Sequence, residues 1–141
     1  MAVKSLSGIL KQTSEIDDRK ERIEFLRKNM NKQLAEIIKL TYNGKIEWDL
    51  PEGSPPFKPS EYDEPANLYR EVKRFNIFVK GNYETMHKIK REDMFIKMLE
   101  YVDKEDAKLI VGMKDKKLPY PRLTEKFMKE ALPELFDEKV S

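Results

Sequence analysis

Apolar side chains recur every three or four residues through most of the chain, which is the spacing of one face of an α-helix. Leu34, Ile37 and Ile38 are typical of this pattern. The periodicity predicts seven helices, over residues 5–13, 17–29, 31–42, 67–80, 86–102, 104–113 and 124–132. Only residues 45–49 resemble a strand, and there is no internal repeat or heptad run. We therefore expect an all-α fold of about six or seven helices, forming a single domain over residues 1–141.

Polar residues stand where several of these helices should begin or end. Ser14 or Asp17 could cap the second helix, and Asp103 and Thr124 could cap the sixth and seventh. Asn43 and the glycine after it are typical of a helix end. A break in the fifth helix is expected near residue 90.

Residues 45–65 form a long acidic segment with five prolines, which exclude a helix. Two lysines face six carboxylates there, a balance of −4. Trp48 and Phe57 indicate that this loop packs down onto the domain. A loop this long is usually functional or well anchored, and anchoring by Trp48 is the simpler interpretation.

Composition limits the class of protein. The 141 residues suit one domain, and the absence of cysteine excludes disulfides and thiolate metal sites. No apolar run is long enough to span a membrane, so no membrane partner is expected. The first residues lack the apolar core and cleavage site of a secretory signal. These features lead us to expect a soluble, cytoplasmic protein.

Residues able to carry chemistry are sparse. His87 is the single histidine, so it cannot anchor a zinc site, and a surface position is expected. The five glycines form no nucleotide-binding loop. Asp103 to Asp106 lacks the ligand spacing of a calcium loop and is better explained as a helix start. We therefore expect a binding protein without catalytic residues, metal or cofactor, and not an enzyme.

Positive charge concentrates in two segments, with balances of +5 over residues 67–91 and +3 over residues 113–126. The first contains an expected stripe opposite the apolar helix face: Arg70, Lys73 and Arg74. The second leads into the helix start at Thr124, where free backbone N–H groups favour phosphate. Its candidate DNA contacts are Lys114, Lys116, Lys117, Arg122, Thr124 and Lys126. The alternative is that the lysine run is simply a solvated turn.

Two long stretches carry a resemblance: ILKQTSEIDDRKERIEFLRKNMNKQLAEIIKLTYNGKIEW (Ile9 to Trp48) and VDKEDAKLIVGMKDKKLPYPRLTEKFMKEALPELF (Val102 to Phe136). In order and spacing they are similar to the N-terminal DNA-binding domain of ATP-dependent DNA ligases from T-even-type phages. The segments LPEGSPPFKP and KDKKLPY also resemble a family of small uncharacterised proteins of T4-like phages.

The resemblance implies a module that holds double-stranded DNA largely through its backbone, in a host-cell cytoplasm. Residues 113–126 match one of the ligase contact turns, but Leu118, Pro119 and Tyr120 stand among positions where ligases have small residues. No KxDG adenylation motif occurs in the chain, which excludes ligase activity.

Two functions follow as hypotheses. The first is a non-catalytic, phage-type DNA-binding module. The second is an accessory factor for replication or transcription machinery, which would dock a partner protein through the acidic loop or the C-terminal ALPELF segment. Completion of the core is the simpler interpretation of ALPELF.

Overall fold

Three helices at the N-terminal end each begin with a side-chain cap. They are α1 (Leu6–Glu15), α2 (Arg19–Lys28) and α3 (Lys32–Tyr42). The α2 cap is Asp18, whose carboxylate accepts a hydrogen bond of 2.9 Å from the backbone N–H of Glu21. The prediction of Ser14 or Asp17 as this cap was therefore wrong. Asp18 immediately precedes the first helical residue. From this position its side chain can accept a hydrogen bond from a backbone N–H in the first turn, as an N-cap does.

The expected helix over residues 67–80 is two elements. These are α4 (Pro65–Glu71) and the 3₁₀ helix η1 (Val72–Phe78). Val72, Phe75 and Phe78 are buried, and a 3₁₀ helix of three residues per turn places all three on one face. Pro65, expected to exclude a helix, instead begins α4, because the first helical position needs no backbone N–H.

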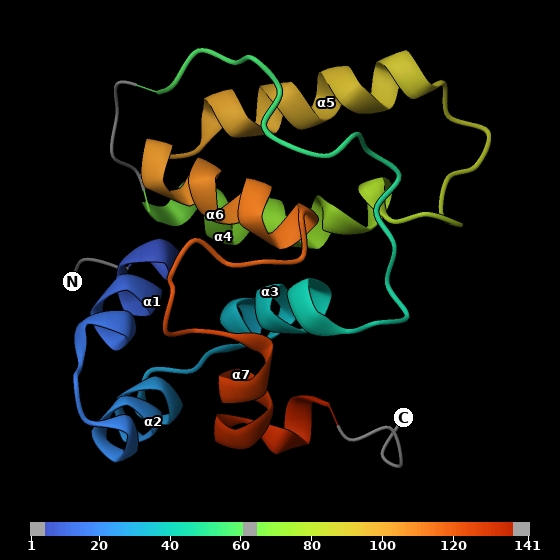
Figure 1. Cartoon of the computed structure of the whole chain (residues 1–141). Coiled ribbons are helices and arrows are strands. Elements are labelled where there is room, and N and C mark those ends of the chain that lie inside the picture. Colours follow the sequence, from blue (N-terminus) through green and yellow to red (C-terminus); the bar gives the residue numbers. More distant parts are fainter. Residues whose placement is uncertain (1–4, 61–64, 137–141) are drawn as a thin grey trace.

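The C-terminal half contains α5 (Lys88–Tyr101), α6 (Lys104–Lys114), α7 (Glu125–Ala131) and the 3₁₀ helix η2 (Pro133–Leu135). The caps predicted at Asp103 and Thr124 are confirmed. α5 starts two residues later than expected and continues through Lys90 without the expected break. α5 and α6 pack together, while α7 lies against α2 at the other end of the molecule (Figure 1).

One apolar core runs through the part described by this computed structural model, residues 5–60 and 65–136. Within these ranges there are seven α-helices and no strand, which confirms the all-α prediction. α3 and α6 pack against each other near the centre (Figure 1). The largest fully buried side chains come from α1 to α6 and from η1. They include Leu10, Leu34, Phe75, Leu99 and Ile110.

The segment after α3 is held at several places across residues 48–58. Trp48 pairs with Val79 in an isolated antiparallel bridge, in place of the strand-like pattern expected for residues 45–49. Further along, the backbone N–H of Gly53 donates to Asp115 at 3.1 Å, and that of Lys58 donates to Glu100 at 2.8 Å. A further contact, between Pro51 and α6, is described below. Anchoring of this loop is therefore confirmed as far as Lys58; residues 61–64 lie outside the described residues.

Candidate anion-binding site

Lys114, expected to contact DNA, instead holds the acidic loop. Its side chain is only 2% exposed, and its ammonium donates to the carbonyl oxygen of Pro51 at 2.8 Å and pairs with Asp115. A buried ammonium needs such partners because its desolvation is costly. The expectation of an exposed phosphate contact at Lys114 was wrong for this reason.

Lys116 has a similar structural role at the end of α3. Its ammonium donates to the carbonyl oxygens of Leu40, Asn43 and Ile46, at 3.2, 2.8 and 3.2 Å. Carbonyl groups at a helix C-terminus lack partners and carry partial negative charge, so they attract a cation. Partial burial lowers the pKa of Lys116 below its ordinary value. The structure thus turns Lys116 inward, contrary to the expected DNA contact.

Acidic residues also lie over this part of the basic turn. Glu47 and Glu52 from the loop line a hollow of about 600 Å³ together with Lys114, Asp115 and Lys116. Three carboxylates therefore accompany two lysines there, which makes the hollow unfavourable for a phosphate. Lys117, the next residue, is exposed.

The expected stripe of Arg70, Lys73 and Arg74 is not a uniform basic surface. Arg70 donates to Asn67 at 3.0 Å, while Arg74 donates to both carboxylate oxygens of Glu71, at 3.3 and 3.1 Å. The change from α- to 3₁₀ geometry at residue 72 alters the spacing on which the stripe depended. All three residues are exposed, but within residues 5–60 and 65–136 Lys73 alone makes no hydrogen bond or ion pair.

A different cationic hollow lies where α2, the turn before α7 and α7 meet. It has a volume of about 280 Å³ and is lined by Arg19, Arg22, Arg122, Thr124, Lys126, Phe127 and Glu130. Three of the predicted contacts, Arg122, Thr124 and Lys126, therefore do line one hollow. Because liquid water occupies about 30 Å³ per molecule, the space can hold a phosphate group with some of its water.

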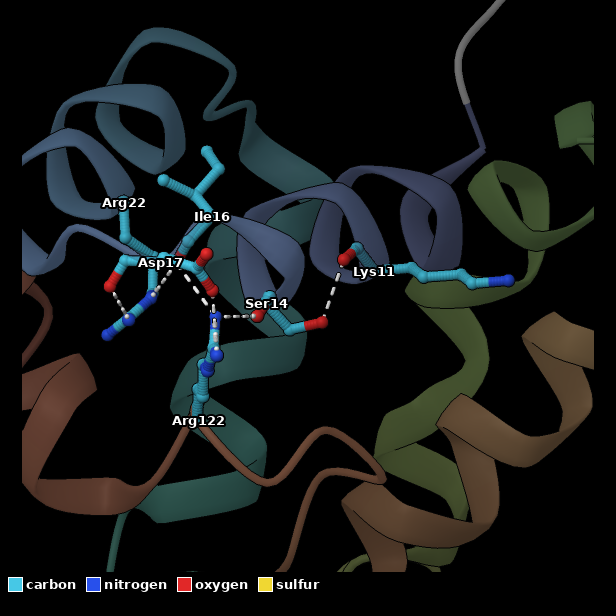
Figure 2. A network of polar contacts seen from close by, with 6 residues as sticks. All are labelled: Lys11, Ser14, Ile16, Asp17, Arg22 and Arg122. Atoms are coloured by element: carbon cyan, nitrogen blue, oxygen red, sulfur yellow. Dashed lines mark hydrogen bonds and ion pairs between the residues drawn. The ribbon is translucent and has the colours of Figure 1, made fainter.

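Two arginines of this hollow converge on the end of α1. Figure 2 shows Arg22 and Arg122 approaching the segment that joins α1 to α2. The carbonyl oxygen of Ile16 accepts from both, at 2.9 Å from Nε of Arg22 and 3.1 Å from Nη1 of Arg122. Arg22 also donates to the carbonyl oxygen of Asp17, and Arg122 to that of Ser14. These carbonyls position two like charges beside each other.

Aromatic stacking and two carboxylates complete the arrangement. The guanidinium groups of Arg19 and Arg22 lie over the Phe127 ring, at 5.7 and 5.5 Å from its centre. Such stacking favours arginine without neutralising its charge. Arg19 forms an ion pair with Glu130, and Arg122 forms one of 2.9 Å with the exposed carboxylate of Asp17.

Arg22 differs from Arg19 and Arg122 in having no carboxylate partner within residues 5–60 and 65–136. The residue is 9% exposed, and its hydrogen bonds go to neutral carbonyl groups. A guanidinium keeps its charge at any physiological pH, so a nearly buried one favours an anion in its surroundings. This is the feature of the hollow that most favours a negatively charged ligand.

Arg19 and Arg22 were not among the predicted contacts. They stand in the run Arg-Lys-Glu-Arg that begins α2, whose charge looked like an ordinary solvated helix face. A signal was present in the sequence, since α2 contains five basic and two acidic residues. The sequence did not indicate, however, that α7 packs against this helix.

Other kinds of site have no support in the described ranges. No group of three or more histidine, aspartate or glutamate side chains there could hold a metal ion. None of the described helices is both long enough and apolar enough to cross a membrane.

Comparisons with known proteins give a family and no function. No curated protein and no solved structure matches the chain significantly, so the likeness to ligase DNA-binding domains stays an expectation. A family of unknown function (DUF6433) matches residues 9–120. That range contains Arg19 and Arg22, and it ends just before Arg122 and α7. Since the match covers well over half of the sequence, the chain belongs to the DUF6433 family.

Proposed function

We propose that this protein is a non-catalytic module that binds double-stranded DNA by contacting its phosphate backbone. The hollow between α2 and α7 would be the centre of the contact surface. The observation that carries the proposal is Arg22, a nearly buried guanidinium without a carboxylate partner among the described residues. The phosphate groups of nucleic acids are anions whose shape and charge a guanidinium matches well.

The proposal moves the centre of the DNA contact away from the lysine run. Lys114 and Lys116 are engaged by backbone carbonyls, whereas Lys126 and half-exposed Arg122 and Arg19 surround the hollow. Lys117 and Lys73 are exposed and could add peripheral contacts. The resemblance to phage ligase domains supports the same class of ligand, with a different set of residues.

The protein-interaction hypothesis has less support from the two segments that suggested it. The acidic loop is fixed to α5, α6 and Val79 by the contacts described above. In ALPELF, Ala131 and Leu132 are buried, and Leu135 and Phe136 pack against the core. Neither segment, as far as it is described, offers a free strand or helix face for a partner groove.

The test is the salt dependence of duplex binding by a double variant, Arg19→Ala with Lys126→Ala. Fluorescence anisotropy on a labelled duplex would give the affinity at several salt concentrations. Each lost phosphate contact should lower the slope of log K against log salt by about 0.9, so the double variant should lose about 2.

Lys97→Ala is the matched control. It removes one exposed lysine from α5, at the opposite end of the molecule from α7 (Figure 1), and should leave slope and affinity nearly unchanged. An unchanged slope in the double variant, with circular dichroism showing a folded protein, would contradict the proposal. Equal losses in the control and the double variant would do the same, because they would indicate a contact with no preferred surface.

A further inference from the structure

The net charge of the hollow exceeds what one internal backbone phosphate can balance. Four cations surround it: Arg19, Arg22, Arg122 and Lys126. Two carboxylates pair with them, those of Glu130 and Asp17, which leaves two positive charges. An internal phosphodiester carries one negative charge. A phosphate monoester, with a second pKa of about 6, carries nearly two at neutral pH.

The burial of Arg22 favours the same kind of ligand. Its residue exposure is 9%, against side-chain exposures of 46% for Arg19 and 44% for Arg122. An internal diester is ester-linked on both sides, so the nucleic-acid chain must continue past the hollow in two directions. A terminal phosphate projects from the chain end, and its three free oxygens can reach a recessed guanidinium.

The positions of Arg22 and Arg122 are fixed before any ligand arrives. Both donate to the carbonyl oxygen of Ile16, so neither guanidinium needs to be ordered by the ligand (Figure 2). Cationic groups that are already ordered cost little entropy when an anion binds beside them.

We infer that this hollow takes a phosphate monoester dianion, and that on DNA its ligand is the terminal phosphate of a phosphorylated strand end. The second part rests on the proposed function, because DNA is there the carrier of the phosphate. The first part stands on the charge and burial of the hollow itself.

The test compares short duplexes of one sequence with 5′-phosphate or 5′-hydroxyl ends. One additional charge at a partly exposed site should give about fivefold tighter binding of the phosphorylated duplex. The preference should fall toward one when the pH is lowered from about 7.5 to 5, because the monoester then loses its second charge. Arg19→Ala with Lys126→Ala should lose the preference, and Lys97→Ala should keep it.

Inorganic phosphate, followed by NMR at the Nε–Hε group of Arg22, tests the hollow without DNA. A saturable shift that Lys97→Ala retains and the double variant loses supports the inference. Equal affinity for the two duplexes, together with no saturable shift, overturns it while leaving backbone binding intact. A phosphate-dependent shift with no binding of either duplex overturns the proposed function and retains the monoester site.

Discussion

Replacing Lys116 by methionine should destabilise the fold by removing the cation that caps α3. Methionine keeps an unbranched apolar stem but cannot donate to the carbonyl oxygens of Leu40, Asn43 and Ile46, which lie 3.2, 2.8 and 3.2 Å from the ammonium. The backbone at this residue has a positive φ of 64°, and this conformation is equally unfavourable for lysine and methionine. The difference in stability between the two proteins therefore reports the loss of the ammonium.

The size of the effect follows from these contacts. A hydrogen bond that involves a charged group contributes about 1.5–3 kcal/mol. Because Lys116 is only partly buried, water can replace some of the lost donors, and we expect a total loss of about 2 kcal/mol rather than the sum of three bonds. For a domain of this size, that corresponds to a fall in melting temperature of about 8 °C.

Urea and thermal unfolding, followed by circular dichroism, would measure this loss. Lys117→Met is the matched control, because it makes the same substitution at an adjacent exposed lysine and should change stability by no more than about 0.5 kcal/mol. Equal stability of the two variants would refute the reasoning, since it would mean that the three carbonyls need no cation.

Three further substitutions have definite expected outcomes. Gly112→Ala should cost about 2 kcal/mol in urea unfolding, because the added Cβ would lie 2.8 Å from the Lys117 carbonyl oxygen; a neutral result would mean that the turn moves freely. Burial raises the pKa of Tyr120 above its ordinary value of 10.0, so the unfolded chain loses this proton first and stability falls as pH rises above about 10. Tyr120→Phe should therefore show a shallower alkaline decline in unfolding free energy, and an unchanged decline would count against this assignment. Glu130→Gln frees Arg19 and should tighten duplex binding about threefold in low-salt anisotropy, whereas weaker binding would speak against the hollow.

The helices could be predicted because each buries an apolar face with its own periodicity. The misplaced boundaries have local causes that the same periodicity does not contain. Apolar residues at a spacing of three, such as Val72, Phe75 and Phe78, suit an α-helix and a 3₁₀ helix almost equally. Only the packing of the completed fold decides between them.

The candidate site was predictable only in part. Arg122 and Lys126 stood out by their charge, but the sequence could not separate them from Lys114 and Lys116. The difference depends on backbone carbonyls from distant segments, and a carbonyl group is present at every residue. The sequence therefore does not indicate whether a lysine side chain is solvated or donates to the carbonyl groups at a helix end. Arg22 was misjudged in the opposite way. It was expected to lie on an exposed helix face, but it is buried because α7 packs over it.

The contacts of Arg22 and Arg122 at the end of α1 also affect the order in which parts of the protein can fold. Arg122 reaches Ser14 and Ile16 across more than a hundred residues, and Arg27 reaches the carbonyl oxygen of Ala131 over a similar interval. Joining such remote segments closes a loop of more than a hundred of the 141 residues, which costs entropy and slows folding. During synthesis, α1 and α2 cannot form these hydrogen bonds until Arg122 and α7, close to the C-terminal end of the sequence, have been made. The contacts of α1 and α2 with the C-terminal segment therefore form late, although these two helices can pack against each other earlier.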